Sequence, residues 1–210
     1  MGIITVLAGI AVPAVKGITS ANALDSGAAK LSGLMTLARS EAIARHTVVR
    51  FVVATDWSGQ GQDANYRRMS LWEWQPDTQS YAQFTNWEAL PNGVIIERQL
   101  PDYIRGASYA SADASTVRGT YVLDESLGAG AAFTPDTGGD QISGRFIEFL
   151  PSGAARIPGS SDRRAIFVAT QGFGNADKHI VYTSQSNNRP ANWAQVNVDT
   201  LTGRVHVYRP

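Results

Sequence analysis

Residues suited to catalysis are few in this sequence and match no known catalytic motif. The three histidines, His46, His179 and His206, stand far apart, and none belongs to a zinc-binding HExxH helix. The GxSxG turn of serine hydrolases and the glycine-rich phosphate loops are absent from the sequence, and Gly172-Phe-Gly174 is predicted to lie in an ordinary loop. The sequence therefore predicts a protein that is not an enzyme and has no catalytic residues. A hydrolase stays open only if His179 or His206 meets a serine and a carboxylate in space.

Asp136 and Asp140 are the candidate metal ligands. They flank Thr-Gly-Gly and supply the carboxylate oxygens that Ca²⁺ prefers. Their spacing does not match a defined calcium-binding loop, and aspartate beside glycine is also typical of a plain turn. The sequence has no cysteine, which excludes disulfides and thiolate metal sites. Calcium at this pair is the one cofactor that the sequence suggests.

Arginine is enriched in the C-terminal third of the chain, which raises the question of a nucleic-acid partner. Phosphate contacts need only a cluster of basic side chains, so the candidates for binding DNA or another polyanion are Arg163, Arg164, Arg204 and Arg209. Aspartates are interspersed among them, and the chain has 18 basic and 18 acidic residues. Because a neutral chain has no net field that attracts polyanions, we favour a solvated surface over a nucleic-acid site.

Tryptophan is the other side chain that could form a binding surface. Strand alternation places Trp72 and Trp74 on one side of their predicted strand and Glu73 on the other. Tryptophans in such a pattern could stack on carbohydrate or lie at a protein interface, where aromatic side chains are enriched. We favour a division of the whole set between core positions and contacts with other subunits; the set is Trp57, Trp72, Trp74, Trp87 and Trp193.

The first 46 residues are predicted to form a long helix in two parts. Residues 1–15 are apolar or small except for one threonine, and in residues 16–46 apolar side chains recur every three or four positions while charged ones fall elsewhere. From Pro13 to His46 such a helix would be roughly 50 Å long. The residues expected to mediate assembly are Ile3, Ile4, Val6, Leu7, Ile10, Val12 and Pro13. Those expected to pack on the rest of the protein are Leu24, Leu31, Leu34, Leu37 and Ala38, with Ala28, Met35 and Ala42 on the same apolar face. Gly17, Gly27 and Gly33 would allow neighbouring helices to approach closely.

Three interpretations of the apolar part stay open. A membrane-spanning helix needs about 20 apolar residues, and this run offers about 15. A secretory signal peptide would be cleaved at the small-x-small triplet Ala21-Asn22-Ala23, yet no basic residue precedes the apolar run. In the third interpretation Met1 is an internal methionine of a longer apolar segment. About nine further residues would then bring the run to about 24, which is enough to span a bilayer.

Residues 47–210 are predicted to form one globular β-rich domain. Strand-like runs alternate with turns that use many of the 20 glycines and 9 prolines. Residues 195–199 and 204–208 form the clearest hairpin. The segment 98–144 is less regular, with a short strand expected at 119–123, and a loop of that length is usually functional. Other strands are expected at 47–54, 66–75, 81–84, 94–96, 145–150, 155–157, 165–170 and 180–183. The predicted fold is α+β, a long N-terminal helix packed on a globular antiparallel β-sheet domain.

Several stretches of the sequence, taken in order, point to one family. They are the head with Ala11-Val12-Pro13-Ala14, the helix LSGLMTLARSEAIARH at 31–46, and the turn-and-strand segments Trp87–Val94, Ile147–Gly153 and Val198–Val205. In this order they resemble the type IV pilins and the pseudopilins of type II secretion, especially the minor pseudopilin H and FimT-like group. The family's basic leader, cleavage glycine and early glutamate are not in the sequence, which fits the third interpretation of the head.

The resemblance implies a pilin-like fold and a structural role. The chain is expected to be a minor pseudopilin of a type II secretion system, held in the bacterial inner membrane by one N-terminal helix with its globular domain in the periplasm. Its partners would be other pilins or pseudopilins in a filament, the membrane and secreted cargo, and its mature N-terminus would be methylated. Some relatives bind calcium or DNA, which adds interest to Asp136, Asp140 and the C-terminal arginines. The alternatives are a subunit of an extracellular type IV pilus, filament-forming or minor and including DNA uptake, and a secreted β-rich ligand-binding module.

Overall fold

A long helix, α1 (Gly2–Ala44), begins the chain, and strands follow from Val49 onward. The computed structural model describes residues 2–57, 65–101, 104, 119–124, 130–133, 141–174, 180–183, 185–186 and 189–209, and within α1 it describes the side chains from Asn22 onward. Asp136, Asp140 and His179 lie outside these residues. The side chains of the predicted assembly residues, Ile3 to Pro13, are outside them as well.

The helix ends because His46 turns the backbone into the left-handed region, with φ of 53°. The N–H of His46 donates to the carbonyl of Ile43 at 3.4 Å, and the N–H of Thr47 donates to that of Ala42 at 3.3 Å. This pair of bonds is a Schellman motif, which satisfies the last carbonyls of a helix. His46 is therefore the cap of α1, which ends two residues before the predicted boundary.

The first sheet forms around the long pairing of β1 (Val49–Trp57) with β8 (Ile142–Phe149). Its order is β3-β2-β1-β8-β7, where β2 is Arg68–Gln75, β3 is Ser80–Gln83 and β7 is Gly130–Phe133. Two short strands pair at its margins, β4 (Glu88–Ala89) with β2 and β9 (Ala155–Arg156) with β8. All of these pairs are antiparallel. Because β7 forms a strand, the prediction of an irregular loop is wrong for residues 130–133.

The second sheet is built around β10 (Arg164–Gly174), in the order β11-β10-β14-β15. Here β11 is Ile180–Tyr182, β14 is Trp193–Asp199 and β15 is Val205–Tyr208. Two further strands also pair with β10. They are β5 (Val94–Ile96), which is antiparallel to it, and β6 (Thr120–Tyr121), which is parallel to it. A separate ribbon joins β12 (Gln185–Ser186) to β13 (Arg189–Pro190).

Two predictions about this second sheet have clear outcomes. The hairpin of residues 195–199 and 204–208 is confirmed as β14–β15. The prediction that Gly172-Phe-Gly174 is a loop is wrong, because these residues extend β10 and pair with β11. A Cβ at Gly172 would lie 2.9 Å from the backbone oxygen of Val181, so glycine lets the two strands approach.

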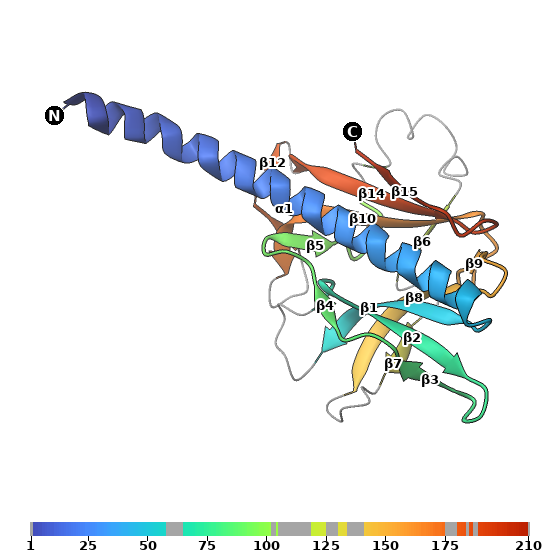
Figure 1. Cartoon of the computed structure of the whole chain (residues 1–210). Helices are drawn as coiled ribbons and strands as arrows, with labels where there is room; N and C mark the ends of the chain where they lie inside the picture. The colour runs from blue at the N-terminus through green and yellow to red at the C-terminus, as the bar shows by residue number, and fades with distance from the viewer. Residues whose placement is uncertain are drawn as a thin grey trace.

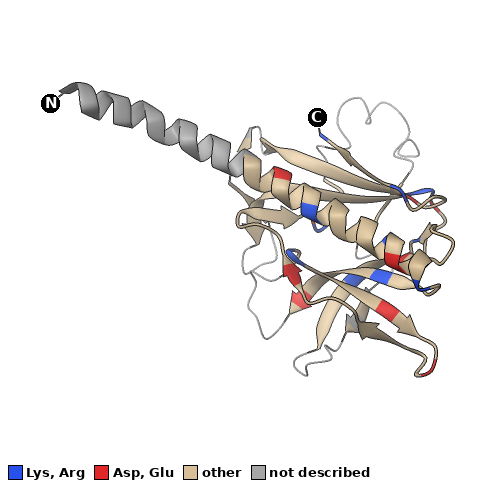
Figure 2. Cartoon of the chain, in the orientation of Figure 1, with Lys and Arg blue, Asp and Glu red and all other residues tan. Residues whose placement is uncertain are grey.

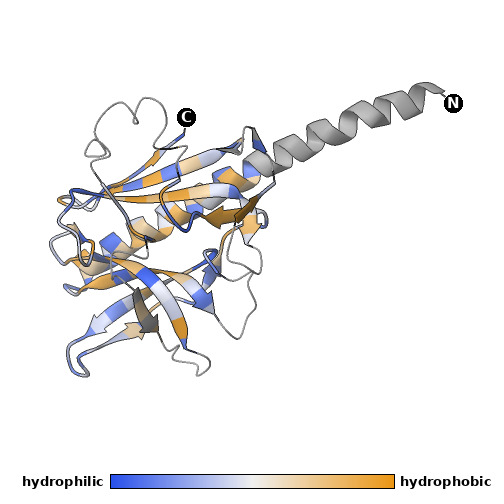
Figure 3. Cartoon of the chain, turned by 180° about the vertical axis from the view of Figure 1, so that it is seen from behind, coloured by the Kyte–Doolittle hydropathy of each residue, from blue (hydrophilic) through white to orange (hydrophobic). Residues whose placement is uncertain are grey.

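One face of α1 lies across both sheets and forms the core with them (Figure 1). Buried and partly exposed residues alternate along β14, whereas β10 is buried along most of its length, and apolar residues are frequent on the strands of both sheets (Figure 3). Phe51 of β1 and Phe167 of β10 meet there edge to face, with ring centroids 5.8 Å apart. The N-terminal helix and antiparallel sheets of the predicted α+β fold are thus present, and the parallel pairing of β6 with β10 is an addition to the prediction.

Arg39 of α1 holds two C-terminal turns against the helix. Its Nε donates to the carbonyl of Gly153 at 3.1 Å and to that of Thr202 at 2.9 Å. Gly153 and Gly203 have φ of 82° and 63°, and a Cβ on Gly203 would overlap the Gly153 carbonyl oxygen. The two turns therefore touch through their backbones. These turns belong to two of the segments that carry the resemblance to pseudopilins.

We predict that Gly203→Ala lowers the free energy of unfolding by about 3 kcal/mol, since it adds a steric clash to the cost of a left-handed backbone. Gly93→Ala is the matched control, because Gly93 has φ of 79° but open space within 4 Å of a Cβ. The control should lose about 1 kcal/mol. Urea unfolding of the two variants measures the difference, and equal losses would contradict the contact between the turns.

Candidate functional site

The buried face of α1 contains most of the residues predicted to pack on the domain. Leu24, Leu31, Leu34 and Ala38 are at most 6% exposed and belong to the core. The prediction is wrong for Leu37, which is 38% exposed. Leu37 is about 100° around the helix from Ala38 and so lies outside the buried face. Ala28, Met35 and Ala42 complete that face.

Among the described residues, no helix combines the length and the apolar character needed to cross a membrane.

Every charged side chain in the described half of α1 has a partner along the flanks of the helix. Lys30 pairs with Glu88 at 3.0 Å, and Asp25 pairs with Arg209. Arg45 bonds Glu41 at 2.8 Å and Glu73 at 3.1 Å, and Arg39 bonds the two turns described above. No charge of this half is therefore left on the side of α1 that faces away from the sheets.

The outward side of α1 carries a row of small uncharged residues, which we call the small-residue face, and the larger Leu37 and Ile43 are exposed beside it. Its members are exposed and follow one another at intervals of three and four residues: Ser26, Ala29, Gly33, Thr36 and Ser40. A Cβ on Gly33 would meet nothing within 4 Å. Gly27 behaves differently, because its Cβ would lie 2.9 Å from Val94 of β5. The close approach predicted at Gly27 is thus made with the chain's own domain, whereas Gly33 is open.

The candidate polyanion-binding arginines do not form one cluster. Arg163, Arg164 and Arg204 are exposed near the start of β10 and the β14–β15 turn, where Arg164 stands opposite Asp199. Arg209 follows Tyr208, at the other end of β15, and pairs with Asp25. The turn also holds Asp199 as an anion, because the N–H of Thr202 donates to its carboxylate at 2.9 Å and lowers its pKa. Basic and acidic residues are interspersed over the described chain (Figure 2), and the structure does not bring the four arginines together.

The remaining candidates for chemistry are not brought together in the described chain. His46 caps α1, and His206 is exposed on β15. Within the described residues no three metal-ligating side chains converge. Calcium at Asp136 and Asp140 stays a prediction, because both residues lie outside the described part.

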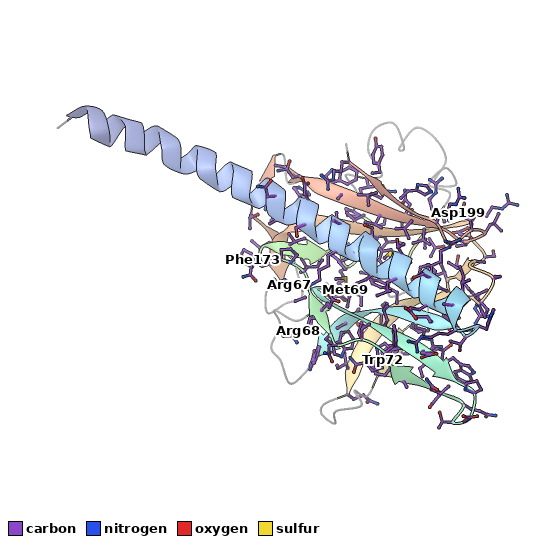
Figure 4. The ribbon with its side chains drawn as sticks, in the orientation of Figure 1. Arg67, Arg68, Met69, Trp72, Phe173 and Asp199 are labelled. Atoms are coloured by element: carbon purple, nitrogen blue, oxygen red, sulfur yellow. The ribbon has the colours of Figure 1, made fainter. Side chains whose placement is uncertain are left out.

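Alternate residues of the first sheet form a second apolar group on the side turned away from α1, which we call the aromatic cluster. It consists of Val52, Trp72, Phe133 and Phe146, with Trp87 and Tyr81 packed against it. Trp72 lies on β2 (Figure 4), its ring 5.1 Å from that of Phe133 and 6.5 Å from that of Trp87. The indole Nε1 atoms of Trp72 and Trp87 are buried and have no hydrogen-bond partner among the described residues.

Glu148 is the buried charge beside this cluster, and it is only 3% exposed. Its Oε1 accepts from Nε and Nη2 of Arg50, each at 3.0 Å, and from the hydroxyl of Tyr81 at 3.1 Å. Its Oε2 accepts from Nε of Arg156 at 2.8 Å and also from Nη2. We call these four residues the Glu148 cluster. Every oxygen of the carboxylate is satisfied, which is what burial of a charge requires.

The Glu148 cluster also fixes the side chains around it. The guanidinium of Arg50 lies 3.4 Å from the ring centroid of Tyr81 and 4.1 Å from that of Phe146. Burial and then the negative charge of Glu148 raise the pKa of Tyr81 to about 12. Sequence reasoning missed this cluster, because Arg50 and Glu148 become neighbours only through the β1–β8 pairing.

We predict that Glu148→Gln lowers the free energy of unfolding by about 3 kcal/mol, because it leaves two guanidinium groups without their shared anion. Glu88→Gln is the control, since the Lys30–Glu88 pair is about a third or more exposed on both sides. An exposed pair of that kind contributes at most about 1 kcal/mol. Thermal unfolding compares the two variants, and an equal effect would refute the importance of the buried carboxylate.

No protein-family model and no curated protein matches this chain. Two solved structures of the minor pseudopilin EpsH from the type II secretion system of Vibrio cholerae are similar to it. One is 11% identical, with a TM-score of 0.43, and the match covers 89% of this chain and 97% of that chain. The other is 14% identical, with a TM-score of 0.44, and the match covers 90% and 95%. At these identities and TM-scores the likeness establishes neither the family nor the function of the chain.

Proposed function

We propose that this chain is a structural subunit of a pilin-like filament, a minor pseudopilin of a type II secretion system that assembles through α1. The observation that carries the proposal is the small-residue face. A helix on the surface of a globular protein normally directs charged and polar side chains toward water. Here the charged residues of α1 are bonded along its flanks, and the outward side is uncharged, with a row of small residues beside the exposed Leu37 and Ile43.

The spacing and size of these residues suit the packing of a second helix. Intervals of three and four residues keep side chains on one seam of an α-helix. Small residues on such a seam let two backbones approach closely, above all where the helices lie in lipid. The N-terminal part of α1, with Ile3 to Pro13, would continue this contact within the inner membrane, and the β-domain would stay in the periplasm. The work of the subunit is then mechanical, and no bond is made or broken.

Two alternatives are distinguished by what happens to the N-terminal segment. A type IV pilus subunit would use the same small-residue face in an extracellular filament. A secreted ligand-binding module would lose the segment by cleavage after Ala23. That cut would fall inside α1, beside Leu24, which is 4% exposed in the core, and two residues before Asp25, which pairs with Arg209. The structure therefore favours retention of the segment.

We predict that Ala29→Cys and Gly33→Cys cross-link the subunit to a neighbouring pilin-like subunit in its native cells, because both positions lie on the small-residue face. The natural chain has no cysteine, so each variant carries a single thiol. Asp77→Cys, on the exposed β2–β3 turn, is the control and should give no helix-to-helix product. Mass spectrometry of the cross-linked peptides identifies the partner. Products from Asp77→Cys alone would show that α1 is not the assembly surface.

We also expect the mature protein in its native cells to begin about nine residues before Met1, since an apolar run of about 24 residues is then long enough to span a bilayer. Its first residue should follow a glycine in the encoded sequence and carry an N-methyl group. Mass spectrometry of the N-terminal peptide tests this expectation. A mature chain that begins at Leu24 would instead establish the secreted module.

A further inference from the structure

The two sides of the first sheet differ in charge. Glu73 and Glu88 are on the side of α1, where they pair with Arg45 and Lys30. We call the opposite side the outer face. Strand alternation and the registers place three arginines and one glutamate of the described strands there, a net charge of +2, namely Arg50, Arg68, Arg156 and Glu148. Glu73 and Glu88 thus pair with the helix, and the described strands have an excess of positive charge on the side that faces away from it.

The outer face also has hydrogen-bond donors without acceptors. The indole N–H groups of Trp72 and Trp87 are buried and have no hydrogen-bond partner among the described residues. Trp72 as a whole is only 2% exposed. A buried donor without an acceptor is costly relative to a paired one. Trp87 is itself only half-buried and lies between β3 and β4, at the margin of the sheet.

We propose that the outer face binds an acidic segment of a partner protein. Carboxylates of that segment would pair with Arg68 and Arg156, which is 59% exposed. Oxygen acceptors of the same segment would meet the indole N–H groups as Trp87 turns aside. Its apolar side chains would contact only the parts of the Trp57, Trp74 and Tyr81 rings that stay exposed, since each ring is half-buried. This binding goes beyond filament assembly and uses no residue of α1.

A single-stranded nucleic acid is the other polyanion that aromatic and basic residues attract, and it would need free ring faces for base stacking. The rings on the outer face are already engaged. Arg68 lies 4.9 Å from the ring centroid of Trp57, and Arg50 lies 3.4 Å from that of Tyr81. Trp74 packs on the same Tyr81, with centroids 5.0 Å apart. The exposed guanidinium of Arg156 and the unpaired indole donors therefore favour carboxylates over bases.

The test follows the indole N–H resonances of the full chain in detergent micelles by NMR, assigned with Trp72→Phe and Trp87→Phe. The probe is a short capped peptide of alternating glutamate and leucine, and its counterpart has lysine in place of glutamate. We expect the glutamate peptide to shift the Trp72 and Trp87 resonances and the lysine peptide to leave them unchanged. Arg68→Glu and Arg156→Glu should each weaken the binding by about tenfold, as loss of a paired charge does. Arg163→Glu, just before β10 of the second sheet, should bind as the natural chain does.

Three results would overturn the proposal. They are no shift at millimolar glutamate peptide, equal shifts with both peptides, or tighter binding of oligothymidylate than of the glutamate peptide. The last result would identify a nucleic-acid surface. Arg68→Glu is the variant of reference if Arg156→Glu fails to fold, because Arg156 also bonds the buried Glu148. Failure of this test leaves filament assembly through α1 untouched, since the two surfaces share no residue.

Discussion

The burial of one face of α1 against both sheets is the interaction on which the rest of the structure depends. The two sheets share no strand pair among the described residues. Besides backbone bonds such as those from Ala155 N–H to the Thr200 carbonyl at 2.8 Å and from Ile96 N–H to the Tyr66 carbonyl at 2.9 Å, the core between them and the helix joins them. Full burial of a leucine such as Leu31 contributes about 2 kcal/mol. Alanines at 28, 38 and 42 and the contact of Gly27 with Val94 let the helix lie close to the strands.

Burial alone does not fix the rotation of a helix about its axis, and the flanking polar contacts of α1 do so. Lys30–Glu88, Arg45–Glu73 and Asp25–Arg209 tie the helix to three different strands or strand ends. Each exposed pair contributes at most about 1 kcal/mol of stability, so stability is a minor part of their role. Their joint effect is geometric, because they hold the small-residue face in one orientation relative to the β-domain. The β-domain would then lie at a defined angle to a neighbouring subunit that packs on that face.

Local patterns allowed much of this fold to be predicted. The period of α1 identified Leu24, Leu31, Leu34 and Ala38, and turn residues located the β14–β15 hairpin. Leu37 was misassigned because the residue type suits a core position, although the helical period places it near Gly33 and Ser40 on the outward side. The glycines of β10 were misassigned because their tolerance in a strand depends on β11, which approaches them from later in the chain.

The candidate sites were harder to predict because they depend on long-range pairing. Arg50 and Glu148 are 98 residues apart in sequence, and their bond follows from the β1–β8 register. Arg209 is five residues from Arg204 in the sequence, but the extended strand between them separates the two side chains along the sheet. Spacing in the sequence therefore suggested a cluster of arginines that the fold does not form, and it gave no sign of the Glu148 cluster.

The two outward surfaces differ in the kind of partner that each suits. The small-residue face of α1 has no charge to select a partner, so its specificity comes from shape and repetition, as in contacts between similar helices. The outer face of the first sheet carries net positive charge beside aromatic rings, and charge gives specificity for a chemically different partner. Because α1 covers the opposite side of that sheet, a helix packed on α1 would not cover the outer face. A subunit held in a filament by its helix would thus keep a separate surface for selecting another protein.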